Sequence, residues 1–427
     1  MPKTATETPS VETLAADCEQ AARELSTLPT EKKNRVLRRM ADALEAEEEA
    51  ILAANGQDVS AAREEGISDA LIDRLVLTPE RIEKMADALR DVASFADPVG
   101  EMSSTTKRPS GIEVGKMRIP LGVIGMIYEA RPNVTADAAG LCFKAGNAVL
   151  LRGGSNAFRS NQAIASALHE ALEAENVNPA AVTVVPTTDR AAVEEMLTLN
   201  EHVDLIIPRG GEGLIRYVDE TSRIPVIKHY KGVCHLYVDR NADLSVAEDL
   251  LLDGKVSRPS VCNALETLLV HEDVADDFLP RAKELLGDAG VELRGDARTR
   301  AILLDGVAEA TEDDYAAEYL DLTLAVRVVD SDEAARAHIT EYGSNHTEVI
   351  VTDTLPTARR FVRSVDASVV LVNASSRFSD GGELGLGAEI GISTTKLHAY
   401  GPMGLDALTT EKFVVYGTGE TRHPVET

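Results

Sequence analysis

The feature that most constrains the fold of this chain is an alternation of short apolar segments with helix-like segments, which begins near residue 122. Four apolar segments have the length and composition of buried strands, and a helical pattern follows each of them; they are VIGMIYE (123–129), NAVLLR (147–152), VTVVP (182–186) and VDLIIP (203–208). Repeated strand–helix–strand units favour a parallel sheet with helices on both faces. We therefore expect a doubly wound α/β fold, whose ligands bind beyond the carboxyl ends of the strands.

The part of the chain before residue 105 is expected to be mostly helical. Apolar residues at helical spacing predict a helix over residues 11–25, with Ser10 as its cap. A second amphipathic pattern predicts a helix from Thr30 to Asn55 that ends at Gly56. A chain of 427 residues is too long for one hydrophobic core, so we expect at least two domains.

Three later segments mark the limits of the alternating region. Residues 105–118 predict a polar hairpin around a Pro-Ser-Gly turn. The segment PVIKH (225–229) is predicted to be the last strand of the first series, and a second series of strands and helices starts near Gly232. Residues 397–417 are predicted to return as a strand beside the early hairpin.

The composition restricts the partners of this protein. The chain has 43 basic and 71 acidic residues and therefore a net charge of -28 at pH 7. A surface this acidic repels nucleic acids and anionic membranes, so we expect neither as a partner. The acidic excess, the preference for Arg over Lys and the lack of Trp suggest an organism with a salt-rich cytoplasm, in which ions screen the repulsion.

The cysteines indicate neither a disulfide framework nor a metal site. They are far apart, and they form no CxxC pair and no ligand pattern with neighbouring histidines. The chain also has no window of 18 apolar residues, and it does not start with a basic segment followed by an apolar stretch. We expect a soluble cytoplasmic protein without a metal. The four cysteines are Cys18, Cys142, Cys234 and Cys262.

Cys262 is the candidate nucleophile. It stands in SRPSVCNALETLLV (257–270), where a polar loop follows a predicted helix over residues 245–256 and precedes an apolar strand. A loop between two rigid elements can expose a thiol and fix its direction, as a nucleophile requires. A buried cysteine that only packs is the commoner role, and the thiol alone does not decide between the two.

Three polar turns follow strands of the first series. Asn133 lies between a strand and a helix, where its amide can donate to an oxyanion or cap the helix. The turns RGGS (152–155) and PRGGEG (208–213) each open a helix, so their backbone amides can hold a pyrophosphate at the positive helix end. Glycine can also serve the geometry of such a turn alone.

Cationic side chains gather in these same motifs, although basic residues are scarce in the chain. An acidic protein that binds anionic ligands has to concentrate positive charge locally, and charge-assisted hydrogen bonds to phosphate are strong. Ordinary surface ion pairs are the alternative. His235 and His346 are expected to be structural histidines. The cationic candidates are Arg131, Arg152, Arg209, Lys228, His229, Lys231 and Arg258.

Seven segments together resemble the gamma-glutamyl phosphate reductase family, which belongs to the aldehyde dehydrogenase superfamily. They occur in the order and spacing of that family and cover roughly residues 10 to 417. The segments lie at residues 114–155, 204–215, 225–239, 258–271, 318–331, 341–352 and 372–410.

The resemblance implies an aldehyde dehydrogenase-like α/β fold with three parts. A nicotinamide-cofactor domain with a doubly wound parallel sheet would take residues 1–104 and 119–231, and an α/β catalytic domain would take residues 232–396. A small β element for oligomerisation would take residues 105–118 and 397–427. A homo-oligomer is therefore expected.

The resemblance also implies roles for the candidate residues. Cys262 would be the nucleophile and Asn133 the oxyanion donor. The cofactor would be NADPH or NADP. Its adenosine ribose would be bound by Arg152, Gly153 and Ser155, and its pyrophosphate by Gly210, Gly211 and Gly213. Glu318 would bind its nicotinamide ribose. The candidates for holding the substrate are Lys228, His229, Lys231 and Arg258 at its phosphate and Arg377 at its amino-acid end.

The implied reaction is the NADPH-dependent reduction of L-glutamyl 5-phosphate to L-glutamate 5-semialdehyde and phosphate, in proline biosynthesis. Hydrolytic aldehyde dehydrogenases carry a Glu that activates water where KHYKGVCH (228–235) has no carboxylate, so a thioester on Cys262 would resist hydrolysis. Glutamate 5-kinase would supply the substrate, with channelling as a further possibility.

Three other functions remain open. The chain could be an aldehyde dehydrogenase for another acyl donor, a cysteine hydrolase or acyltransferase without a redox cofactor, or a non-catalytic nucleotide-binding or scaffold protein. Binding of a nicotinamide cofactor would separate the first of these from the second, and labelling of a single fast thiol would exclude the third.

Overall fold

The computed structural model describes residues 9–423, and these form two compact units. Unit 1 contains the chain up to Ile227, the short segment Leu386–Gly391 and the chain from Met403 onward. Unit 2 contains Lys228–Gly385 and Ile392–Pro402. Each unit has its own parallel sheet, which confirms the α/β class. Among the described residues, no helix is long and apolar enough to cross a membrane.

The sheet of unit 1 has the strand order β5-β4-β3-β6, and all of its strands are parallel. These strands are β3 (Val123–Tyr128), β4 (Ala148–Gly153), β5 (Val182–Val184) and β6 (Leu205–Arg209). The helices between and after them are α6 (Asn133–Lys144), α7 (Phe158–Ala174), α8 (Ala191–Met196) and α9 (Glu212–Thr221). The chain runs outward from β3 through β4 to β5 and then returns to β6 on the other side of β3. The strand order therefore reverses between β3 and β6, and ligands of such sheets bind where it reverses.

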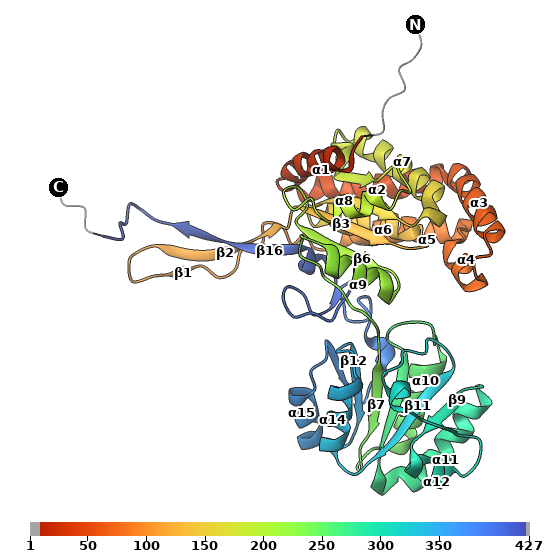
Figure 1. Cartoon of the computed structure of the whole chain (residues 1–427). Helices are drawn as coiled ribbons and strands as arrows, with labels where there is room; N and C mark the ends of the chain where they lie inside the picture. Colours follow the sequence, from red (N-terminus) through yellow and green to blue (C-terminus); the bar gives the residue numbers. More distant parts are fainter. Residues whose placement is uncertain (1–8, 424–427) are drawn as a thin grey trace. The chain divides into compact units, whose positions relative to one another are not determined.

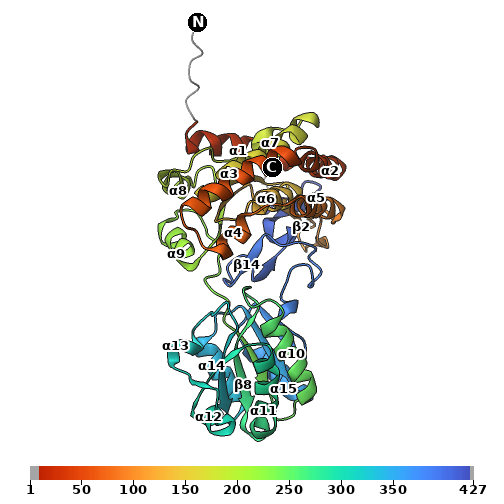
Figure 2. The same cartoon turned by 90° about the vertical axis from the view of Figure 1, so that its right-hand side faces the viewer.

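In the part of the chain that the structure describes, five helices precede this sheet, and α2 and α3 pack against α7 (Figure 2). The Ser10 side chain caps α1 by accepting from the Thr13 amide, as predicted. The predicted helix from Thr30 to Asn55 is wrong, because the chain breaks at Glu47 and Gly56 lies inside the next helix. After the break, α3 packs Val59 and Ala62 against Ala157, directly before α7, and Asp58 accepts from the amide and hydroxyl of Ser160. The five helices are α1 (Val11–Leu25), α2 (Thr30–Ala46), α3 (Glu48–Glu64), α4 (Asp69–Leu75) and α5 (Pro79–Ser94).

A three-stranded antiparallel ribbon extends from the helices of unit 1 (Figure 1). Strands β1 (Thr106–Lys107) and β2 (Glu113–Pro120) form the predicted hairpin, and Gly111 turns it with a φ of 101°. Strand β16 (Thr409–Tyr416) pairs with the full length of β2, which confirms the predicted return of the chain end. A separate two-stranded sheet consists of β14 (Gly391–Ser393) and β15 (Gly401–Met403).

Unit 2 contains a seven-stranded sheet of order β10-β9-β11-β8-β7-β12-β13, again entirely parallel. Its strands are β7 (Cys234–Val238), β8 (Leu265–His271), β9 (Glu292–Gly295), β10 (Ala308–Glu309), β11 (Thr323–Val329), β12 (Thr347–Val351) and β13 (Val369–Val372). Its helices are α10 (Leu244–Val256), α11 (Glu272–Asp288), α12 (Ala297–Leu303), α13 (Glu312–Tyr315), α14 (Asp332–Tyr342) and α15 (Leu355–Ser364).

Helices cover both faces of this sheet, with α10 and α11 on one side and α14 and α15 on the other (Figure 1). Alternate residues of β7 serve the two cores, because Leu236 packs with the first pair of helices and Tyr237 with the second. The predicted strand at 225–229 is wrong. Only Val226 forms an isolated bridge, to Ile206, because the chain leaves unit 1 directly after it.

Candidate active site

Cys262 lies in the loop between α10 and β8 and is the only one of the four cysteines that is not buried. Burial raises the pKa of the Cys18 thiol to about 12 and raises the pKa values of Cys142 and Cys234 strongly. A thiol that stays protonated and sealed is a poor nucleophile. The sequence left open whether a cysteine packs in the interior or acts as a nucleophile. Packing fits the other three cysteines, whereas Cys262 is partly exposed in a loop.

The main chain of Cys262 is held by the residues just before and at the start of β7. The Cys234 thiol donates to the Cys262 carbonyl oxygen over 3.2 Å. A Cβ atom on Gly232 would lie 2.0 Å from the same oxygen, so only glycine permits this approach. Sequence reasoning missed the role of Gly232, although a glycine directly before a buried strand is a signal of close backbone contact.

A chain of buried polar groups lies behind the nucleophile. The ring of His346 meets the Cys234 sulfur at 3.8 Å and the Thr347 hydroxyl at 2.8 Å through Nδ1, and that hydroxyl donates to Ser379 over 2.8 Å. Burial lowers the pKa of His346 to about 3, so its ring is neutral. This network supports the loop, and the buried neutral ring of His346 fits the structural role expected of it.

Glu318 reaches the same region through the loop that follows α13. Its Oε1 accepts from the Gly232 amide over 2.9 Å, and the Lys231 ammonium donates to the Ala316 carbonyl over 2.6 Å. These two bonds tie the loop to the residues beside Cys262. Unit 2 therefore brings the predicted residues Glu318 and Lys231 close to the nucleophile.

A buried ion pair joins the two elements on either side of the Cys262 loop. Lys255, at the end of α10, donates to Glu266 on β8 over 2.7 Å, and both side chains are fully buried. Glu266 also accepts from the amide of Leu320, whose φ of 55° is unusual for this residue type. Burial raises the pKa of Glu266 to about 7 and lowers the pKa of Lys255. Sequence reasoning did not single out either residue.

The other predicted residues of unit 2 surround the loop less directly. The His229 ring lies 6.0 Å from the His346 ring, and the Lys228 ammonium lies 5.3 Å from the centre of the Tyr230 ring. Arg258 is exposed in the Cys262 loop itself. Arg377 accepts at its carbonyl oxygen from the Asn263 side chain over 3.5 Å.

Asn133 is the first residue of α6 in unit 1 and does not cap that helix. Its side-chain nitrogen donates instead to Asp137, one turn later, over 2.8 Å. Burial raises the pKa of the Asp137 carboxyl to about 6. The capping role is therefore not the one observed, and the carboxyl of Asp137, which the sequence did not point to, orients the amide.

The turn at 152–155 is organised around Arg152, which is almost completely buried. Its guanidinium donates to the carbonyl oxygens of Gly153, Thr188 and Asp189 over 2.7, 2.9 and 3.2 Å. These bonds engage both terminal nitrogens with the protein backbone. Ser155 is exposed at the start of the following helix. The arginine thus shapes the turn, and the serine lies at its surface.

The turn at 208–213 opens α9, with Gly211 at the N-cap position. The Gly211 amide donates to the Glu129 carboxylate over 3.0 Å, and Glu129 would also meet a Cβ on Gly210 at 2.5 Å. No atom lies within 4 Å of the Cβ positions of Gly211 and Gly213, so the space beside them is open. Both turns and Asn133 follow the adjacent strands β4, β6 and β3, which brings them to one edge of the sheet.

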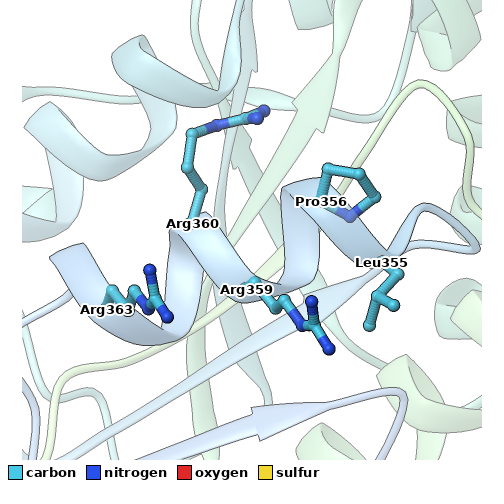
Figure 3. A pocket seen from close by; sticks show the side chains of 5 residues that line it. All are labelled: Leu355, Pro356, Arg359, Arg360 and Arg363. Atoms are coloured by element: carbon cyan, nitrogen blue, oxygen red, sulfur yellow. The ribbon is translucent and has the colours of Figure 1, made fainter.

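A separate hollow of about 300 Å³ lies against α15 and contains none of these residues. Arg359 and Arg363 extend from one side of the helix there, and Arg360 extends from another (Figure 3). Arg360 pairs with Asp332 over 3.1 Å. Within residues 9–423, no three His, Cys, Asp or Glu side chains are grouped to hold a metal ion.

Comparison with known proteins identifies close relatives over the whole chain. The model of the aldehyde dehydrogenase family matches residues 3–300. A gamma-glutamyl phosphate reductase from Salinibacter ruber is 86% identical over 426 residues, which cover 100% of this chain and 98% of the relative. A gamma-glutamyl phosphate reductase from Xanthomonas axonopodis pv. citri is 60% identical over 414 residues and covers 97% of this chain and 100% of the relative.

Solved structures agree with these matches. The crystal structure of a gamma-glutamyl phosphate reductase from Thermotoga maritima superimposes with a TM-score of 0.95 at 45% identity and covers 97% of this chain and 100% of the other. An acetylating aldehyde dehydrogenase from Geobacillus thermoglucosidasius superimposes with a TM-score of 0.69 at 17% identity, covering 97% and 98% of the two chains. The second likeness concerns the fold alone.

Proposed function

The chain belongs to the aldehyde dehydrogenase family and, within it, to the gamma-glutamyl phosphate reductases, and from this premise we propose how its residues carry out the reaction. The enzyme is an oxidoreductase of proline biosynthesis that converts L-glutamyl 5-phosphate to L-glutamate 5-semialdehyde. The observation that carries the proposed mechanism is the partly exposed thiol of Cys262, in a chain whose other three thiols are buried.

The first proposed step is the attack of the Cys262 thiolate on the carbonyl carbon of the acyl phosphate. A carbon–sulfur bond forms, the bond from that carbon to the phosphate oxygen breaks, and phosphate leaves with the electron pair. The product is a thioester on Cys262. Phosphate is a good leaving group that needs little protonation, so this step requires no strong general acid.

NADPH is the proposed reductant, and when bound it supplies the hydride that converts the thioester carbonyl to a thiohemiacetal. The chain fits such a group at the edge of the unit 1 sheet, where the space beside Gly211 and Gly213 is open at the N-terminus of α9. Arg152 would support this site by holding the turn around Gly153 and Ser155. Glu318 would contact the nicotinamide ribose.

The negative charge that develops on the carbonyl oxygen needs preorganised donors in both steps. The proposed donors are the backbone amide of Cys262 and the side-chain amide of Asn133. The bond from Asn133 to Asp137 uses one N–H of the amide and leaves a second for the oxyanion. Collapse of the thiohemiacetal then breaks the carbon–sulfur bond, releases the aldehyde and returns the thiol.

The substrate phosphate is proposed to lie among the cationic groups of residues 228–231 and Arg258, because strong hydrogen bonds to phosphate need charged donors. The segment 228–235 has no carboxylate to activate water, which protects the thioester from hydrolysis. We further propose a cytoplasmic homo-oligomer that receives its substrate from glutamate 5-kinase.

Replacement of Cys262 by Ala tests the mechanism. The variant should lose both acyl phosphate reduction and phosphate-dependent oxidation of the semialdehyde, because no thioester can form, while it still binds NADPH. Absorbance of reduced nicotinamide reports the turnover, and quenching of its fluorescence reports the binding. Cys18→Ala, at a buried position on α1, serves as the control and should remain active. Appreciable turnover by Cys262→Ala would exclude the covalent mechanism.

A further inference from the structure

Two buried polar atoms, one in the Cys262 loop and one in the turn bonded to that loop, have no hydrogen-bond partner among the described residues. They are Oδ1 of Asn263 and Nη1 of Arg377. Buried polar atoms in proteins are almost always paired, so an unpaired acceptor and an unpaired cationic donor in neighbouring residues need an explanation. A ligand that carries both a donor and an anion would satisfy the two atoms together.

Asn263 directly follows Cys262 and is only 5% exposed. Its Nδ2 donates to the Ser379 carbonyl oxygen over 3.0 Å and faces the Arg377 carbonyl oxygen at 3.5 Å. Because both oxygens are acceptors, the nitrogen of the amide has to face them. The orientation of the side chain is therefore defined, and Oδ1 is the atom that remains available to a donor.

Arg377 belongs to a short 3-10 helix over Ser376–Phe378. Its amide donates to the Ser375 hydroxyl over 3.2 Å, and its carbonyl oxygen faces Asn263, so its backbone is fixed on the same side of the loop. Its Nη1 has no hydrogen-bond partner among residues 9–423, although the chain has 71 acidic residues. Its Nη1 is buried while the residue as a whole is half-buried, and a guanidinium binds a carboxylate strongly.

We propose that Arg377 and Asn263 together bind the amino-acid end of the substrate, an inference that rests on the proposed function. The guanidinium of Arg377 pairs with the α-carboxylate, and Oδ1 of Asn263 accepts from the α-ammonium. The two unpaired atoms match the two charged groups in sign, since a cation meets the carboxylate and a bare acceptor meets the ammonium.

The size of the substrate agrees with this arrangement. Three carbon–carbon bonds separate its α-carbon from the acyl carbon that Cys262 attacks, a span of about 4 Å when extended. Consecutive Cα atoms of a protein are about as far apart. The α-ammonium of an acyl group on sulfur would therefore lie about one residue length from the acyl carbon, and Asn263 is the residue next to Cys262 in the chain.

Four aldehydes test the proposal in the phosphate-dependent oxidation. They are 2-amino-5-oxopentanoate, 5-oxopentanoate, which lacks the ammonium, 4-aminobutanal, which lacks the carboxylate, and butanal, which lacks both. Arg377→Met should lower kcat/KM about 100-fold for the two carboxylates and less than about 3-fold for the other two. Asn263→Ala should lower it about 10-fold for the two amines only. Arg359→Met, an exposed arginine on α15, should change none of the four.

A variant that merely disturbs the loop would slow all four aldehydes alike, and that outcome would overturn the inference while leaving the proposed function intact. Losses that do not track the missing groups would overturn it as well, because ordered water would then satisfy the two atoms. If the wild-type enzyme does not oxidise 2-amino-5-oxopentanoate with phosphate at all, the proposed function fails and this inference fails with it.

Discussion

At the scale of single residues, Cys262 is held by groups that are far from it in the sequence. Its carbonyl oxygen accepts from Cys234 and lies against Gly232, and Gly232 in turn donates to Glu318. Asn263 extends the same contacts toward Ser379. The direction of the Cys262 side chain thus depends on residues from three other segments. A substitution in one of these segments should therefore displace the sulfur.

Gly232→Ala should inactivate the enzyme while NADPH still binds. The new methyl group would lie 2.0 Å from the Cys262 carbonyl oxygen, and a displacement of about 1 Å at a reacting group can cost 100-fold in rate. We expect kcat/KM to fall at least ~100-fold and the free energy of unfolding to fall by about 2 kcal/mol, measured by steady-state kinetics and urea unfolding.

Gly56→Ala is the matched control for this substitution. Nothing lies within 4 Å of the added methyl group, and Gly56 is inside helix α3. Alanine should therefore raise the free energy of unfolding by about 0.8 kcal/mol without changing the kinetics. A Gly232→Ala enzyme with normal kinetics would show that the close contact does not position the nucleophile.

Asp137 should make stability depend on pH between about 4 and 6. Burial raises the pKa of its carboxyl from 3.8 to about 6, so the folded protein binds the proton more tightly than the unfolded chain. This stabilising contribution is complete below about pH 4 and is lost as the pH rises through 6. Asp137 as a whole is half-buried, so solvent screening reduces the effect and we expect a loss of about 1 to 2 kcal/mol.

Asp137→Asn should flatten this part of the curve, measured by urea unfolding at a series of pH values. Glu24→Gln, an exposed carboxyl-to-amide change on α1, should keep the wild-type shape. Parallel curves for Asp137→Asn and the wild-type protein would contradict the assignment.

At the scale of elements, the candidate residues collect where helices and strands end. The turns after β3, β4 and β6 meet at one edge of the unit 1 sheet, and the Cys262 loop joins α10 to β8. Rigid elements hold such loops from both sides, and the Lys255–Glu266 pair adds a direct link across the loop. The strands of the antiparallel ribbon carry none of the candidate site residues. The exposed apolar side chains of the ribbon suggest contact with another subunit instead.

The ribbon is predicted to mediate association of the subunits. On β16, Phe413 is 71% exposed and Val415 is 54% exposed, which is unusual for large apolar side chains. The double substitution Phe413→Glu and Val415→Glu should lower the molar mass measured by light scattering to that of one chain, with an unchanged circular dichroism spectrum.

The control for this experiment is Leu355→Glu, which changes an exposed leucine at the start of α15. It should leave the mass unchanged. If the double variant keeps the mass of the wild-type protein, the ribbon does not hold the subunits together.

At the scale of the whole molecule, the dominant feature is the net charge of -28. Like charges distributed over one surface repel each other and favour the expanded unfolded chain. Salt shortens the range of this repulsion, from a Debye length of about 10 Å at 0.1 M to about 3 Å at 1 M. The fold should therefore be more stable in concentrated salt.

Thermal unfolding in KCl tests this expectation. We expect the Tm to rise by at least about 5 °C between 0.1 and 2 M KCl, because screening weakens a repulsion that is strongest in the compact state. Differential scanning calorimetry measures the change. A Tm that is independent of KCl, or that falls with it, would contradict adaptation to a salt-rich cytoplasm.

The local pattern of residues was sufficient to predict most of the elements. Apolar strands that alternate with helices, the Ser10 cap and the hairpin at 105–118 depend on neighbours in the chain, and the structure confirms all three. The two wrong elements are of another kind. The break at Glu47 and the missing strand at 225–229 depend on the path and packing of the chain in three dimensions. Local periodicity does not encode that path.

The sequence by itself determined the parallel α/β architecture, the loop that carries Cys262 and the family, because these depend on spacing along the chain. Only the tertiary structure decided which thiols are buried, that Arg152 is bonded to backbone carbonyls, and that Gly232, Glu318 and Arg377 lie around the nucleophile. The physical reason is that burial and hydrogen bonding around these residues join segments that are far apart in the chain, and such contacts exist only once each unit has folded.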